Sequence, residues 1–132
     1  MDMTRWAPAA LIGGRIGLAS LFLLGGLNKS LNYAATISDM ERVGLNPAAI
    51  LLPLVIALEL GGGALVAIGR FGAPVAALAL AIFTLATNAY FHNFWTMQGG
   101  IRALELSLFF KNVSIAGGLV FLAGALSRKA AP

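Results

Sequence analysis

Long apolar runs separated by short polar connections dominate the chain. Four such runs cover residues 7–27, 48–68, 73–93 and 104–126. A helix rises ~1.5 Å per residue, so about twenty residues cross the ~30 Å hydrocarbon layer of a bilayer. The pattern therefore predicts four membrane-spanning helices within a single domain, residues 1–132.

The connections between these runs indicate how the helices are arranged. Gly69-Arg70-Phe71-Gly72 is too short for anything but an antiparallel helical hairpin, and Pro74 follows in the first turn of the next helix, where its missing amide is harmless. Residues 34–43 mix apolar and charged positions before Gly44, which predicts a short helix lying at the membrane interface. No internal repeat is evident, so the sequence favours an all-α fold, an integral membrane antiparallel four-helix bundle.

Composition agrees with this interpretation and excludes several classes of protein. Hydrophobic residues make up 59% of the chain and charged residues 11%, against roughly 45–50% and ~25% in soluble domains. The nine Lys and Arg residues are scattered, so no basic face for nucleic acid is expected. A cleaved signal peptide would also explain the first apolar run, but Arg15 inside it and the lack of a small-x-small cleavage site argue against that reading.

The residues available for cofactor binding are few. The chain has no cysteine and one histidine, so iron–sulfur ligation and a two-histidine haem site are not expected within it, and no metal site is predicted. The cofactor stays unknown at this point.

Two charged residues lie inside the predicted spans, Arg15 in the first and Glu59 in the second. Counted from Ala7 and Ile68, both lie about 12–14 Å from the side that carries the termini, at ~1.5 Å per residue. A lone charge in hydrocarbon is costly, so we predict that Arg15 and Glu59 form a structural ion pair that fixes helix register.

A second polar layer is predicted near the opposite face. Asn88, His92, Lys111 and Asn112 lie within roughly 10 Å of that interface by the same rise per residue, with Trp95 at the rim. These five residues are the predicted ligand-binding set, and His92 and Lys111 are the catalytic candidates, although no familiar catalytic motif is present. Two simpler readings stay open: Lys111 snorkels to the interface, and His92 belongs to an aromatic belt.

Small residues predict where the helices touch. Ala73, Ala77 and Ala81 form a stripe at four-residue spacing on the third span. On the fourth span, helical spacing places Ser107, Lys111, Ser114 and Gly118 on one face, which we expect to turn inward.

The order of several short motifs resembles the DoxX family of small four-helix membrane proteins. The segments that carry the resemblance are Arg15-Ile-Gly-Leu, Gly26-Leu-Asn-Lys29, Gly44-Leu-Asn-Pro47, Glu59-Leu-Gly-Gly-Gly63, His92-Asn-Phe-Trp95, Lys111-Asn112 and Gly117-Gly118. The resemblance implies a loose association with redox chemistry, because that family includes subunits similar to those of thiosulfate:quinone oxidoreductases and proteins linked to quinone or catechol stress. The lack of cysteine sets this chain apart from a self-sufficient enzyme of sulfur chemistry.

The leading hypothesis is an inner-membrane subunit in quinone-linked redox chemistry, a candidate oxidoreductase component whose own catalysis is uncertain. His92 and Lys111 would hydrogen-bond a quinone, Asn88 and Asn112 would orient it, and Trp95 would pack on its ring. The alternative is a non-catalytic membrane module that binds lipid or holds a partner protein, and a small transporter ranks last. The expected partners are the lipid bilayer, a quinone or other lipophilic ligand, a redox partner protein and a second copy of the chain; nucleic acid is not expected.

Charge placement gives an expected orientation. Arg5, Arg70, Arg128 and Lys129 lie on the side of the termini, against Lys29, Arg42 and Arg102 on the other side. The positive-inside rule therefore favours a multi-pass protein with both termini in the cytoplasm, by a small margin.

Overall fold

The computed structural model describes residues 2–130, with side chains through Arg128. Every regular element in this part of the chain is helical. The elements are η1 (Met3–Arg5), α1 (Ala7–Leu31), α2 (Tyr33–Arg42), α3 (Ala48–Ala57), the π-helical η2 (Leu58–Gly62), α4 (Gly63–Ile68), α5 (Ala73–Phe91), η3 (Phe94–Thr96) and α6 (Gly99–Ala130). The predicted all-α fold class is confirmed.

Four segments are long and apolar enough to cross a membrane: Ala7–Leu31, Ala48–Ile68, Ala73–Thr96 and Gly99–Arg128. The second matches the predicted run, and the short helix expected over residues 34–43 is present as α2. The largest difference is the start of the last helix. It begins at Gly99, not near Leu104, because Gly99 takes the positive φ of 69° that turns the chain and nothing after Gly100 breaks a helix.

The second span is one helix with an irregular middle. Pro53 lies inside α3, and η2 then widens the helix at Leu58–Gly62 before α4 resumes the α-helical pattern. A π-helical turn accommodates an extra residue within a helix, and such turns are frequent at functional sites. Gly61, Gly62 and Gly63 leave little side-chain bulk at this turn. The same turn carries Glu59, the charged residue of an otherwise apolar span.

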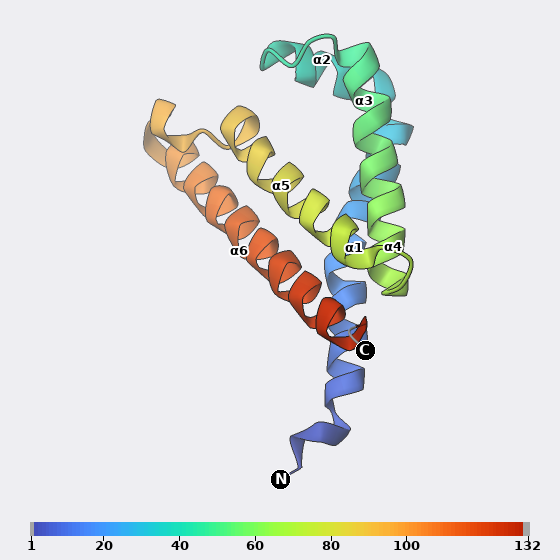
Figure 1. Cartoon of the computed structure of the whole chain (residues 1–132). Helices are drawn as coiled ribbons and strands as arrows, with labels where there is room; N and C mark the ends of the chain where they lie inside the picture. Colours follow the sequence, from blue (N-terminus) through green and yellow to red (C-terminus); the bar gives the residue numbers. More distant parts are fainter. Residues whose placement is uncertain (1, 131–132) are drawn as a thin grey trace.

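The spans form two arms that meet at one end (Figure 1). One arm contains α1 together with α3, η2 and α4, and the other is the antiparallel pair α5 and α6. The arms diverge away from the termini, where α2 lies across the top of α1 and α3 in this view. Both termini lie at the joined end, as the predicted topology requires.

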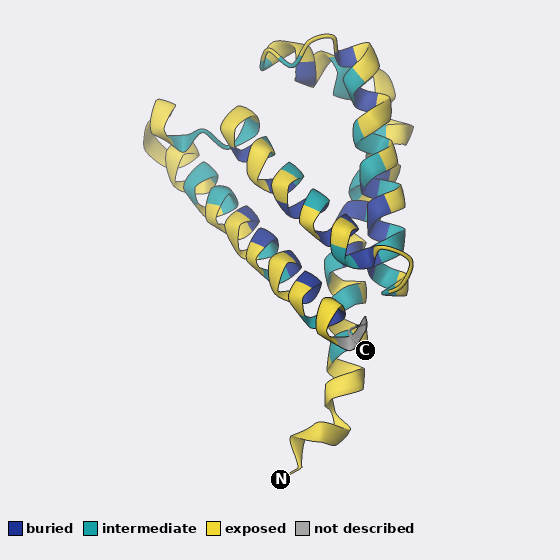
Figure 2. Ribbon diagram, in the orientation of Figure 1, coloured by how far each residue is buried: buried dark blue, intermediate teal, exposed yellow. Residues whose placement is uncertain are grey.

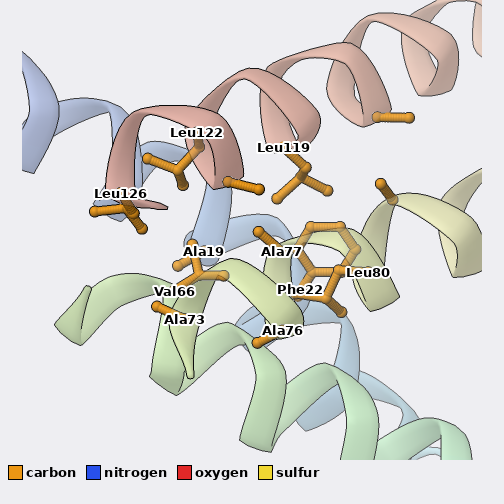
Figure 3. Close-up of a cluster of buried hydrophobic side chains, with 13 residues drawn as sticks. Ala19, Phe22, Val66, Ala73, Ala76, Ala77, Leu80, Leu119, Leu122 and Leu126 are labelled. Carbon is orange, nitrogen blue, oxygen red and sulfur yellow. The ribbon is translucent and has the colours of Figure 1, made fainter. Parts of the chain in front are cut away.

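The main hydrophobic core occupies the joined end (Figure 3). It consists of the buried side chains of Ala19, Phe22, Val66, Ala73, Ala76, Ala77, Leu80, Ala81, Ala116, Leu119, Leu122, Ala123 and Leu126. The predicted stripe of Ala73, Ala77 and Ala81 is confirmed, since all three are buried. A second, smaller cluster of Met40, Ala48 and Leu52 fixes α2 on α3.

The inward face of α6 differs from the prediction. Asn112, Ala116, Leu119 and Ala123 are buried, whereas Ser107, Lys111 and Ser114 are exposed. Of the predicted face, Gly118 is partly buried and lies against Leu18 of α1. Figure 2 shows the buried positions of α6 along its side toward α5. Burial of Ala116, Leu119 and Ala123 stabilises the packing of α6, and the hydroxyls of Ser107 and Ser114 are satisfied by their own helix.

Candidate ligand-binding cavity

A cavity of about 450 Å³ lies between the two arms, on the side away from the termini. Its volume is within the ~300–1,000 Å³ range of small-molecule sites. The walls come from both arms, from α2 and from the connections after α2 and α5. The lining residues are Leu21, Phe22, Gly25, Asn28, Lys29, Thr36, Asp39, Met40, Leu45, Val55, Glu59, Phe83, Thr84, Thr87, Phe91, His92 and Asn112. The wall therefore combines aliphatic and aromatic side chains with nine polar or charged residues.

One wall carries an ion pair between Lys29 of α1 and Glu59 of η2. The Lys29 Nζ lies 3.0 Å from each carboxylate oxygen of Glu59. Glu59 is only 5% exposed, and α1 can come close because it presents Gly25 and Gly26 there; a Cβ on Gly26 would meet Leu60 at 2.8 Å. The pairing gives a buried carboxylate the opposite charge that it needs in an apolar medium.

The predicted pairing of Arg15 with Glu59 is therefore wrong. Arg15 lies against Gly69, and Glu59 lies against Gly25, ten residues farther along α1. At ~1.5 Å per residue the two charges are separated by about 15 Å along the bundle. The depth count failed because it aligned Ala7 with Ile68, whereas the first turns of α1 project beyond the hairpin and are exposed (Figure 2).

Arg15 instead packs at the C-terminal end of α4. Gly69 adopts the left-handed conformation that ends this helix, with φ 73°, and the Arg15 guanidinium occupies the space that a side chain at Gly69 would need. A cation is favourable at a helix C-terminus because the last carbonyls carry partial negative charge. The role of Arg15 is thus to fix α1 on the hairpin, which also requires glycine at position 69.

The opposite wall carries a second acid–base pair. His92 follows the end of α5, and its Nδ1 lies 2.5 Å from the Oε2 of Glu105 on α6. An ionised carboxylate only accepts hydrogen bonds, so Nδ1 is the donor. In the neutral ring this leaves Nε2 as an acceptor for a ligand, the arrangement by which a carboxylate orients a histidine for proton transfer.

Asn88 and Asn112 connect α5 to α6 beside this pair. Asn112 Nδ2 donates to Asn88 Oδ1 at 2.9 Å, and Asn88 Nδ2 donates to the carbonyl of Phe109 at 3.2 Å. Both asparagines are buried, but only Asn112 lines the cavity. Of the predicted ligand-binding set, the structure brings His92 and Asn112 to the cavity, with Asn88 behind Asn112.

Lys111 and Trp95 do not belong to this site. Lys111 is exposed on the outer face of α6. Trp95 is 58% exposed and its indole packs against the rings of Phe94 and Phe109. The prediction failed for Lys111 because it rested on the wrong inward face of α6, and for Trp95 because η3 turns the chain away from the cavity.

Sequence reasoning missed Lys29 and Glu105 as functional candidates. The charge pattern places Lys29 at a membrane flank, although its position four residues after Gly25 puts it on the small-residue face of α1. Glu105 belongs to no motif, yet it is the one acidic residue of the last predicted span. Within residues 2–130 no group of three His, Asp or Glu side chains is placed to hold a metal ion.

Comparison with known proteins identifies the family. The DoxX family model matches residues 10–93. The chain is 36% identical over 121 residues to inner membrane protein YqjF of Escherichia coli (strain K12), covering 92% of this chain and 87% of that protein. It is 30% identical over 116 residues to inner membrane protein YphA of the same organism, covering 88% of this chain and 82% of that protein.

The chain belongs to the DoxX family. The resemblance inferred from the short motifs is therefore confirmed. Four apolar helices and the similarity to two inner membrane proteins indicate a multi-pass inner membrane protein. No solved structure matches the chain.

The DoxX match bears on the cavity directly. It spans α1 through the end of α5 and so includes Lys29, Glu59 and His92, whereas Glu105 and Asn112 lie beyond it on α6. The cavity is thus built by the matched segment and closed on one side by the last helix.

Proposed function

We propose that this DoxX-family protein is a membrane subunit of a quinone-linked redox system and that its cavity binds the ring of a lipophilic quinone-type ligand. The observation that carries the proposal is the His92–Glu105 pair at the wall of a cavity that also has apolar and aromatic surface. This wall suits a flat apolar ring that carries two oxygen atoms: the apolar side chains contact the ring, and the polar pair lies where an oxygen atom can reach it.

Each part of the cavity has a chemical role in this proposal. Phe83 and Phe91 of α5 supply apolar surface for the ring. His92 exchanges a proton with a ring oxygen through Nε2, because Nδ1 is held by Glu105.

Electrons would be supplied by a partner protein. The chain has no cysteine and a single histidine, so iron–sulfur ligation and a two-histidine haem site within the chain are not expected. The proposed role is to bind the ring and to exchange protons with its oxygen atoms, next to that partner.

The test is equilibrium binding of a short-chain quinone, in its oxidised and its reduced form, to the purified protein in lipid nanodiscs. We expect saturable binding, and His92→Ala should weaken binding of the reduced, hydroxyl-bearing form by about tenfold, because the Nε2 lone pair of His92 accepts a hydrogen bond from a ring hydroxyl. Lys111→Ala is the matched control, since Lys111 is a polar residue of the same predicted layer that lies outside the cavity.

The proposal is overturned if neither form of the quinone binds saturably, or if His92→Ala and Lys111→Ala bind the reduced form equally well. Co-purification of a phospholipid that competes for the cavity would instead support a non-catalytic lipid-binding module. Analysis of the lipophilic molecules retained by the native protein separates these two outcomes.

A further inference from the structure

The Arg15 guanidinium makes no hydrogen bond within the part of the chain that the structure describes. Its Nε is buried beside Gly69 and is out of reach of a ligand. Arg15 as a whole is half-buried, and its terminal nitrogens Nη1 and Nη2 keep accessible surface. The N–H groups on these two nitrogens are therefore available to a ligand, in the planar fork that suits carboxylate or phosphate oxygens.

No acidic side chain of the protein pairs with Arg15. The chain has five acidic residues. The ion pairs of the described residues join Asp39 to Arg42, Glu59 to Lys29 and Glu105 to His92. Asp2 accepts hydrogen bonds from Thr4, and Glu41 belongs to α2 at the opposite end of the molecule. An anion for the Arg15 guanidinium must therefore come from outside the chain.

The position of Arg15 relative to the membrane indicates the source of that anion. Arg15 lies against Gly69, in the turn between the span that ends at Ile68 and the span that begins at Ala73. This turn marks an edge of the hydrocarbon layer, where the phosphates of the lipid headgroups begin. The accessible side of the guanidinium thus lies at the level of those phosphates.

A second cation and exposed apolar side chains adjoin Arg15 at this level. Arg70 follows Gly69 directly, is exposed, and lies 5.3 Å from the centre of the Phe71 ring. Phe71 is 76% exposed, and Ile12, three residues before Arg15 on α1, is 46% exposed. Residues three apart on a helix are neighbours, so Ile12 borders Arg15. The surface therefore combines positive charge with apolar side chains.

We propose that this end of the molecule binds the phosphate of an anionic phospholipid, with Arg15 as the main phosphate ligand and Arg70 as the second cation. Hydrogen bonds between a guanidinium and a phosphate are charge-assisted and bidentate, which makes them stronger than neutral ones. The acyl chains lie on the apolar surface that includes Ile12. A free phosphate ester shares the headgroup chemistry but makes no use of that surface. The site is separate from the cavity, so the proposal does not depend on the proposed function.

The test measures binding of the first lipid molecule to the full-length protein in detergent by native mass spectrometry. Phosphatidylglycerol is compared with phosphatidylcholine of the same acyl chains, and soluble glycerol phosphate is tested alone. We expect phosphatidylglycerol to bind about tenfold or more tightly than either, because only this ligand combines a net negative charge with acyl chains.

Four variants assign the binding to the site. Arg15→Gln should weaken phosphatidylglycerol binding by about tenfold, since it removes a charge-assisted bond, and Arg15→Lys should weaken it less, because the charge remains without the fork. Arg70→Gln should also weaken binding, and it keeps the test informative if Arg15→Gln folds poorly. Arg102→Gln is the matched control: Arg102 is likewise exposed and lies 5.5 Å from the Phe94 ring centre, at the opposite end.

Several results would overturn the proposal. It fails if the two lipids bind equally well, or if Arg15→Gln and Arg70→Gln leave the affinity for phosphatidylglycerol unchanged. It also fails if Arg102→Gln weakens binding as much as Arg70→Gln, because the lipid would then respond to the net charge of the protein. If glycerol phosphate binds as tightly as the lipid, the ligand is a free phosphate ester and the assignment to a phospholipid is wrong.

Discussion

Glu59 illustrates how a single charge is stabilised inside an apolar bundle. Its carboxylate is nearly buried, and the partner is Lys29, which reaches it from the adjacent face of α1. The long side chain of a lysine can bury its apolar stem and still place the ammonium at the carboxylate. The pair therefore joins the two helices of one arm at the depth of the cavity.

The first prediction is a double-mutant cycle on this pair. Glu59→Gln should lower the free energy of unfolding in detergent by about 2–3 kcal/mol, less than for a fully buried pair because the Lys29 side chain keeps 29% exposure. Adding Lys29→Gln should recover part of the loss, since it removes the unpaired ammonium.

The comparison cycle uses Arg15→Gln with Glu59→Gln. The two residues lie about 15 Å apart along the bundle at ~1.5 Å per residue, so their effects should add. Coupling between Arg15 and Glu59, or additivity between Lys29 and Glu59, would contradict the observed pairing.

The second prediction concerns the close approach at Gly26. A Cβ there would lie 2.8 Å from Cγ and Cδ2 of Leu60, so Gly26→Ala should destabilise the protein by about 1–3 kcal/mol through overpacking. Gly17→Ala is the control on the same helix, because nothing lies within 4 Å of its added methyl group.

Thermal unfolding of the two variants in detergent measures the difference. Alanine is the better helix former by up to ~1 kcal/mol, so Gly17→Ala should be at least as stable as the parent protein. If Gly26→Ala is equally stable, the helices are not in contact at this residue.

At the scale of elements, the α5–α6 pair is joined by more than its apolar seam. Asn88 accepts from Asn112 and donates to the carbonyl of Phe109, so one side chain of α5 holds α6 at two points. Polar groups buried between membrane helices fix their rotation and register. This fixes the wall of the cavity on which Asn112 and His92 lie.

The third prediction ranks two variants of this link. Asn88→Ala removes both hydrogen bonds and should cost about 1–2 kcal/mol, whereas Asn112→Ala removes one and should cost about 0.5–1 kcal/mol. Denaturant unfolding in detergent gives both values. Ser114→Ala, on the exposed face of α6, is the control. A larger loss for Asn112→Ala than for Asn88→Ala would show that Asn88 is not the central residue.

For the whole molecule, the tertiary structure strengthens the expected orientation. Lys29 lies in an ion pair at the cavity rather than at a flank, and Arg15 lies level with the Gly69 turn on the side of the termini. The charges near the joined end are then Arg5, Arg15, Arg70, Arg128 and Lys129, against Arg42 and Arg102 at the other end. The positive-inside rule counts such charges near the ends of spans, so it favours cytoplasmic termini by a wider margin than the sequence did.

The fourth prediction is that both termini lie in the cytoplasm. A green fluorescent protein fused to the C-terminus should fluoresce, and alkaline phosphatase fused at the same place should be inactive. The matched control is a phosphatase fusion in the connection after α2, which should be active. The reverse pattern of activities would contradict this orientation.

The sequence by itself determined the elements. Runs of about twenty apolar residues have one stable conformation in a bilayer, the helix, because only a helix satisfies all backbone hydrogen bonds within the segment. The hairpin turn at residues 69–72 was predictable because the connection is too short for another arrangement, and the buried stripe of Ala73, Ala77 and Ala81 because small residues at four-residue spacing let helices pack closely. His92 and Asn112 were predictable as cavity residues because a polar side chain within a span is costly in lipid and therefore turns toward the interior of the bundle.

Only the tertiary structure decided which polar groups meet. Helix register depends on the sum of many small packing contacts, such as Gly26 against Leu60 and Arg15 against Gly69. The register they set places Gly25 of α1 beside Glu59, ten residues beyond Arg15, so Lys29 and not Arg15 is the partner of Glu59. The rotation of α6 was set in the same way, by apolar burial against α5, and it placed Glu105 beside His92 and turned Lys111 outward. Counting along one helix cannot give these relations, because each is a property of two helices together.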